Sequence, residues 1–167
     1  MNFRLKMKPP TTTAQMHKVG VRNGKPYFYD PPEVKKAKAD LLAHLSQFVP
    51  EKPYDTAVML SVAWRYPIQG TKHKDGEYRT QKPDTDNLQK LLKDCMTELQ
   101  FWTDDALVVD ESVTKKWVAD RPGIQIGLIS IEEFNRFVLD MTEDADAADT
   151  RCRRRVLHKL LQVSGYL

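Results

Sequence analysis

Four aspartates and one lysine in the middle of the 167-residue chain are the residues most suited to chemistry. Asp84 and Asp86 are two positions apart, Lys90 follows four positions after Asp86, and Asp104 and Asp105 come next. Mg²⁺ prefers oxygen ligands and is commonly held by a few carboxylates, several waters and a substrate phosphate. A metal held in this way can acidify the water that attacks a phosphodiester, and a nearby ammonium can stabilise the charge that grows on the phosphate.

These residue types therefore predict a Mg²⁺-dependent phosphodiester hydrolase, with Mn²⁺ expected to substitute for Mg²⁺. Asp84, Asp86 and Asp105 are the expected metal ligands, and Lys90 is the expected electrostatic helper. Asp104 is expected either to replace one of these ligands or to support one from behind.

A plainer interpretation of the same residues stays open. Asp84 stands where a helix N-cap is expected and Asp86 falls in the first turn, and aspartates favour both positions without any metal. Lys90 lies one helical turn after Asp86 and one before Asp94, so it could simply form surface ion pairs with them.

The distribution of charge favours a polyanionic partner. Residues 1–82 carry a net charge of +8 and residues 83–120 carry −5, within a chain whose total is +3. Positive surface attracts phosphate backbones, whereas an acidic pocket inside it would repel them unless a cation sat there. The polar segment 69–82 supplies four candidate DNA-binding residues, and its alternative is a solvated loop: Lys72, Lys74, Arg79 and Lys82.

The elements that must position these residues follow from hydropathy periodicity and from the placement of proline and glycine. We expect strands at residues 3–7, 58–66, 107–119 and 124–131, helices at 32–48 and 84–99, and a loop or loose hairpin at 11–29. The turn at residues 120–123 predicts that the last two strands form a hairpin. This order predicts an α+β domain with a small mixed β-sheet flanked by helices.

Two stretches match a known pattern. Residues 84–90 read Asp-Thr-Asp-Asn-Leu-Gln-Lys, and residues 101–110 read Phe-Trp-Thr-Asp-Asp-Ala-Leu-Val-Val-Asp. Together they resemble the motif of RusA-type Holliday junction resolvases, over about residues 5–131. The resemblance implies a RusA-like fold and a homodimer that acts on four-way DNA junctions with a divalent metal. It places the family's catalytic carboxylates on Asp84, Asp86 and Asp105, and its catalytic lysine on Lys90.

Two features depart from that family. Residues 11–13 are threonines, where the family often has Asn and Arg, and Pro83 directly precedes the first aspartate, where the family has basic residues. Contacts with a junction could differ there.

Three alternative functions remain: a less selective nuclease for flaps or branched DNA, a non-catalytic junction-binding protein, and an interaction module that uses the C-terminal tail.

The resemblance ends near residue 131, which predicts two parts. Residues 1–131 form the RusA-like nuclease domain, and residues 132–167 form a helical tail with an acidic linker at 140–149 and a basic amphipathic helix at 151–163. No apolar run approaches the roughly 18 residues that a membrane span needs. We therefore expect a cytoplasmic protein with no membrane partner. The resemblance implies a bacterial or phage origin, and we expect no nucleotide cofactor.

Overall fold

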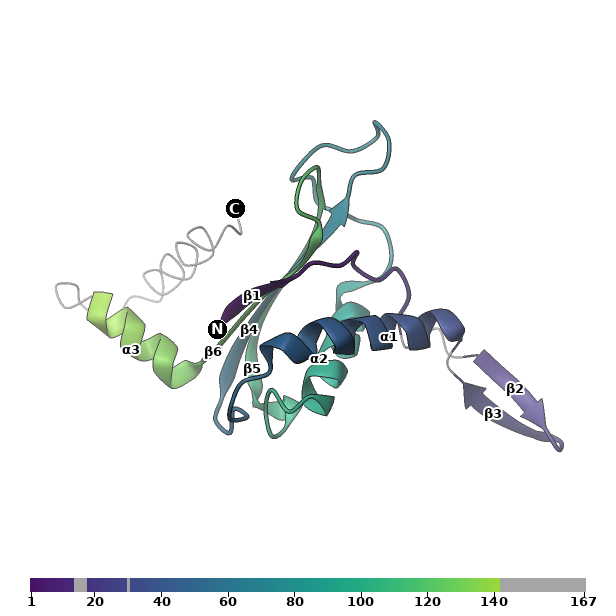
Figure 1. The fold of residues 1–167 in the computed structure, drawn as a ribbon, viewed down its shortest axis with the longest axis horizontal. Coiled ribbons are helices and arrows are strands. Elements are labelled where there is room, and N and C mark those ends of the chain that lie inside the picture. The colour runs from purple at the N-terminus through teal and green to yellow at the C-terminus, as the bar shows by residue number, and fades with distance from the viewer. Residues whose placement is uncertain (14–17, 30, 142–167) are drawn as a thin grey trace.

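The computed structural model describes residues 1–13, 18–29 and 31–141. Its main body is a four-stranded mixed sheet in the order β1-β6-β4-β5, against which α1 and α2 pack (Figure 1). The strands are β1 (Asn2–Leu5), β2 (Lys18–Arg22), β3 (Lys25–Tyr29), β4 (Val58–Pro67), β5 (Val108–Val118) and β6 (Gly123–Ser130). The helices are α1 (Pro32–Leu45), η2 (Ser46–Phe48), α2 (Thr85–Glu98), η3 (Asp105–Leu107) and α3 (Ile131–Met141).

Strand β4 is the centre of the fold. It pairs in parallel with β5 and antiparallel with β6, and β1 pairs with the outer edge of β6. Alternate residues of β4 enter one continuous apolar core with side chains of both long helices. Leu41 of α1, Trp64 of β4 and Leu92 of α2 are each 0% exposed within it. The mixed α/β architecture confirms the expected fold class, and α2 is fixed to the sheet by its buried face.

The prediction that the last two strands form a hairpin is wrong. Residue Val62 of β4 stands between Val113 of β5 and Ile126 of β6, so the two strands are separated by a third. The chain does reverse at the expected turn, but it crosses the end of β4, a distance of about 10 Å for two strand spacings. Gly123 follows this crossing, and a Cβ there would overlap the carbonyl oxygen of Leu5.

Within the region predicted as a loop or loose hairpin, residues 18–29 form a two-stranded hairpin. Strands β2 and β3 pair antiparallel around Asn23 and Gly24, whose φ angles of 52° and 74° suit a tight reversal. The hairpin projects away from the main body beyond one end of α1 (Figure 1). It therefore adds no strand to the sheet that carries α2.

The first part of the expected helical tail is the helix α3, which begins where the nuclease domain was expected to end. Its Phe134 is 6% exposed, so the first turn of α3 packs against the preceding part of the chain. The expected acidic linker lies outside the described residues except for its first two positions, 140 and 141, and the expected basic helix at 151–163 lies wholly outside them. None of the helices among the described residues has the length and apolar character to cross a bilayer.

Candidate active site

Helix α2 begins at the first of the predicted metal ligands. Asp84 is the N-cap residue, with φ −73° and ψ 155°, and its backbone carbonyl accepts a hydrogen bond from the N–H of Leu88 at 3.1 Å. Its exposed carboxylate makes no capping hydrogen bond. The capping interpretation therefore explains why Asp84 stands at the start of the helix, but its carboxylate does not make the hydrogen bond that a capping aspartate usually makes.

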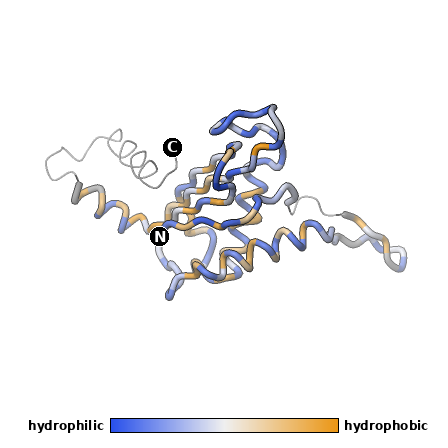
Figure 2. Tube along the Cα trace, turned by 45° about the horizontal axis from the view of Figure 1, so that its top comes forward, coloured by the Kyte–Doolittle hydropathy of each residue, from blue (hydrophilic) through white to orange (hydrophobic). Residues whose placement is uncertain are grey.

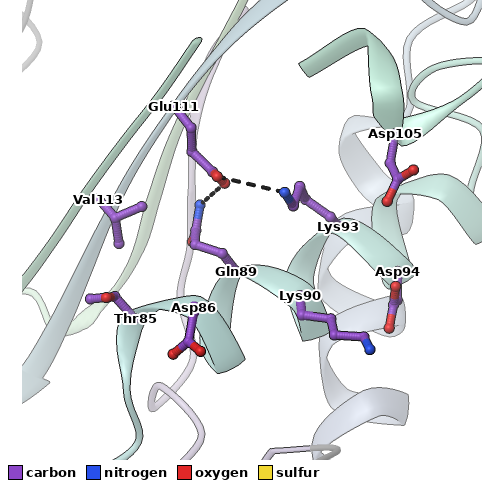
Figure 3. Close-up of a pocket in the computed structure, with 9 residues that line it drawn as sticks. All are labelled: Thr85, Asp86, Gln89, Lys90, Lys93, Asp94, Asp105, Glu111 and Val113. Atoms are coloured by element: carbon purple, nitrogen blue, oxygen red, sulfur yellow. Dashed lines mark hydrogen bonds and ion pairs between the residues drawn. The ribbon is translucent and has the colours of Figure 1, made fainter. Parts of the chain in front are cut away.

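A cavity of about 500 Å³ opens between α2, η3 and β5 (Figure 3). Three of the predicted catalytic residues line it: Asp86 and Lys90 from α2, and Asp105 from η3. Asp84 does not line it, although it precedes Asp86 by only two residues. The remaining lining residues are Thr85, Gln89, Lys93, Asp94, Glu111 and Val113.

The ammonium of Lys90 forms no ion pair within the described part of the chain, and the predicted surface pair with Asp86 or Asp94 is not formed. The side chains of Asp86 and Lys90 are both exposed. A lysine in this state keeps its charge available to an anion that enters the cavity.

The carboxylates suit a metal that retains water rather than one enclosed by protein. Within residues 1–13, 18–29 and 31–141, no three His, Cys, Asp or Glu side chains gather closely enough to hold an ion by themselves. Asp86 and Asp105 share the open cavity, while the carboxylate of Asp104 accepts a hydrogen bond from the N–H of Ala106 at 2.8 Å and caps η3. Mg²⁺ typically takes one or two carboxylates together with waters and substrate phosphate, so this donor set fits it.

A polar chain that sequence reasoning missed holds α2 against the sheet beside the cavity. The indole N–H of Trp64 donates to Gln89 Oε1 at 3.1 Å, and Gln89 Nε2 donates to Glu111 Oε1 at 2.6 Å. Glu111 Oε2 lies 3.5 Å from the ammonium of Lys93, completing a path from β4 through α2 to β5 (Figure 3 shows the Glu111 contacts). Gln89 is 3% exposed, so these bonds fix the helix turn that carries Asp86 and Lys90.

Arg79, predicted to contact phosphate, has a different environment. Its side chain is 7% exposed, and its guanidinium carbon lies 4.2 Å from the centre of the Tyr66 ring and 5.2 Å from that of Trp117. Nη1 and Nη2 donate to the carbonyl oxygens of Gln81 and Lys82, each at 2.6 Å. These contacts enclose the guanidinium, and its contact with phosphate stays a prediction.

The three lysines predicted alongside Arg79 remain candidates for DNA contact. Lys72, Lys74 and Lys82 are exposed. The segment that begins the loop, residues 69–77, follows β4 and is predominantly hydrophilic (Figure 2). Their exposure agrees with the expected basic surface, and their contact with phosphates stays a prediction.

Lys115 of β5 is a further cation that sequence reasoning did not single out. Its ammonium donates to the carbonyl oxygen of Pro83 at 2.6 Å and to that of Gln81 at 3.0 Å. Burial lowers the pKa of Lys115, the charge of Arg79 lowers it further, and the charge of Asp84 raises it. The Lys115 ammonium therefore binds the backbone of the residues that immediately precede α2.

Comparison with known proteins identifies the family to which this chain belongs. The family model described as "Endodeoxyribonuclease RusA" matches residues 8–129. A protein of Lactococcus phage r1t named "Crossover junction endodeoxyribonuclease rusA" is 32% identical over 109 residues, which are 64% of this chain and 81% of the phage protein. The matched region contains β4, β5, all but the last residue of β6, both long helices and every residue of the cavity, whereas β1 lies before it. The chain therefore belongs to the RusA family of endodeoxyribonucleases.

Proposed function

We propose that this protein is a Mg²⁺-dependent, structure-selective endodeoxyribonuclease that resolves four-way DNA junctions by paired, symmetric nicks. The observation that carries the proposal is the meeting of Asp86, Asp105 and an unpaired Lys90 in one open cavity at the start of α2. The name of the phage relative, a crossover junction endodeoxyribonuclease, supports a junction as the substrate.

Asp86 and Asp105 would hold the metal from two sides of the cavity, with Asp84 joining them from the helix N-cap. When bound, Mg²⁺ would supply an acidified water and offset charge on the phosphate. The oxygen of a water molecule would form a bond to phosphorus as the bond from phosphorus to the 3′ oxygen breaks. The water would lose a proton to solvent, and the departing 3′ oxygen would take one up. The products are a 5′-phosphate and a 3′-hydroxyl.

Lys90 would act on the phosphate rather than on the metal. Its side chain is exposed at the cavity, and no described carboxylate neutralises it. A fixed positive charge near the scissile phosphate stabilises the transition state more than the ground state, because negative charge grows there during attack. Exposed Lys72, Lys74 and Lys82 would contact the phosphate backbone on either side.

Paired cutting needs two active sites with matched orientation. A four-way junction has approximate two-fold symmetry, and a closed dimer of identical chains has the same symmetry. A homodimer would therefore place one cavity on each of two opposed strands. Two nicks at equivalent positions leave two duplexes whose ends can be ligated.

The experiment that tests this proposal separates binding from cutting. Asp84→Asn, Asp86→Asn and Asp105→Asn should each abolish cleavage of a four-way junction in Mg²⁺ while keeping or strengthening its binding, since each loses a ligand charge that repels DNA. The matched control is Asp55→Asn, an exposed aspartate outside the cavity, which should cut normally. Cleavage by Asp86→Asn at the wild-type rate would disprove the ligand assignment.

A further inference from the structure

Two cations hold the three consecutive backbone carbonyls that precede Asp84. Arg79 donates to the carbonyl oxygens of residues 81 and 82, both at 2.6 Å. Lys115 donates to that of residue 81 at 3.0 Å and to that of residue 83 at 2.6 Å. Hydrogen bonds from charged donors are shorter and stronger than neutral ones, so this short stretch of loop is held by four strong bonds.

Both cations are rooted in the sheet. The backbone N–H of Arg79 donates to the carbonyl of Lys115 at 2.9 Å, and the N–H of Trp117 donates to the carbonyl of Glu77 at 2.8 Å. The segment before Arg79 therefore runs along the outer edge of β5, where Tyr78 and Lys116 form an antiparallel bridge. The ring contacts of Arg79 add a second anchor, because they enclose its guanidinium between aromatic side chains.

This arrangement determines where Asp84 stands. The carboxylate of Asp84 makes no capping hydrogen bond, so its own side chain does not fix the junction between loop and helix. The cations fix it instead, through the backbone immediately before it. Burial lowers the pKa of the Lys115 ammonium, and the negative charge of nearby Asp84 acts in the opposite direction.

We propose that Lys115 and Arg79 are positioning residues, which hold the loop at residues 81–83 so that the Asp84 carboxylate is preorganised for the divalent metal. This inference rests on the proposed function, because it takes Asp84 to be a metal ligand. Groups that orient a metal ligand from behind commonly change metal affinity by ten- to a hundredfold when they are removed. Neither residue touches the substrate or the metal in this proposal.

The test compares Lys115→Met with Lys116→Met, which removes an equal charge from the next residue of β5, where the ammonium lies 5.1 Å from the centre of the Tyr78 ring and away from the loop carbonyls. Mn²⁺ binding to the DNA-free protein is measured by electron paramagnetic resonance, and the Mg²⁺ concentration for half-maximal junction cleavage is measured alongside it. Lys115→Met should raise the Kd for Mn²⁺ about tenfold, and it should raise the Mg²⁺ concentration for half-maximal cleavage by the same factor. Lys116→Met should leave them unchanged, and Lys115→Arg should restore most of the loss because it keeps the donors.

Three results would overturn the proposal: unchanged metal affinity in Lys115→Met, equal losses in Lys115→Met and Lys116→Met, or no rescue by Lys115→Arg. Asp84→Asn distinguishes these from failure of the proposed function. If Asp84→Asn binds Mn²⁺ as the wild type does, the ligand assignment itself is wrong. If Lys115→Met does not fold, Arg79→Lys is judged by the same tenfold criterion, because lysine keeps the charge but lacks the planar guanidinium whose two nitrogens reach the carbonyls of residues 81 and 82.

Discussion

Replacing Gln89 with leucine should weaken the fold and the active site together. The Gln89 side chain is 3% exposed and bridges Trp64 to Glu111, with distances of 3.1 and 2.6 Å. Leucine has a similar volume but neither donor nor acceptor. The substitution would therefore leave the indole N–H of Trp64, a residue that is 0% exposed, without its hydrogen-bond partner.

The expected cost follows from these two bonds. A buried donor without a partner costs about 1–3 kcal/mol, and a hydrogen bond to a carboxylate contributes about 1.5–3 kcal/mol. Glu111 is partly exposed, so water replaces much of the second bond, and leucine adds some apolar burial. We expect the free energy of unfolding to fall by about 2–3 kcal/mol. For a chain of this length that corresponds to a Tm lower by roughly 5–10 °C.

Thermal unfolding followed by circular dichroism measures this effect, with Gln125→Leu as the control. Gln125 also donates a side-chain hydrogen bond, to Asn2 at 2.6 Å, but that bond is exposed, so its loss should be small. Cleavage by Gln89→Leu, measured well below its Tm, should also be slower because the turn of α2 that carries Asp86 and Lys90 loses its tie to the sheet. A Tm equal to that of the control would refute the claim that this chain of hydrogen bonds holds α2.

Three further predictions concern charge and the tail. Lys90→Ala should slow single-turnover cleavage by about 10²- to 10³-fold at an unchanged Tm, because the lost contact exists only with the phosphate; a normal rate would show that Lys90 has no part in the chemistry. Neutralising Lys72, Lys74 and Lys82 together should reduce the slope of log binding constant against log salt concentration by roughly 2–3, measured in Ca²⁺ to prevent cutting. An unchanged slope would instead indicate that the phosphate backbone runs along Arg4, Lys6 and Lys8. A chain that ends at Met141 should stay folded and keep Mg²⁺-dependent cleavage, since it retains buried Phe134 and every proposed site residue; unfolding would show that the tail completes the core.

The elements that local pattern controls were predictable. The alternation around Val62 identified β4, and the apolar spacing from Leu88 identified α2 to within a residue at each end. The pair Asn23-Gly24 is typical of a hairpin turn because both residues tolerate a positive φ, and the structure has a positive φ at both. The motif around Asp86 named four catalytic candidates, and the structure brings three of them into one cavity, whereas Asp84 lies outside it.

What depends on contacts distant in sequence was not predictable. The turn before Gly123 showed that the chain reverses there, but only packing against β4 decided that β5 and β6 lie on opposite sides of it. Arg79 had the sequence context of a solvated loop residue, and only Tyr66 and Trp117 explain its burial. Lys115 looked like an ordinary strand residue, because its partners are backbone carbonyls more than thirty positions earlier.

The most direct test of the proposed activity is cleavage of a mobile four-way junction, with products mapped on all four strands and with flap and linear duplex DNA as comparison substrates. In Mg²⁺ we predict nicks at symmetric positions on two opposed strands of the junction, ends that DNA ligase can seal, and no cutting in EDTA. Cutting in EDTA, equal rates on flap or duplex DNA, or nicks confined to one strand would contradict it.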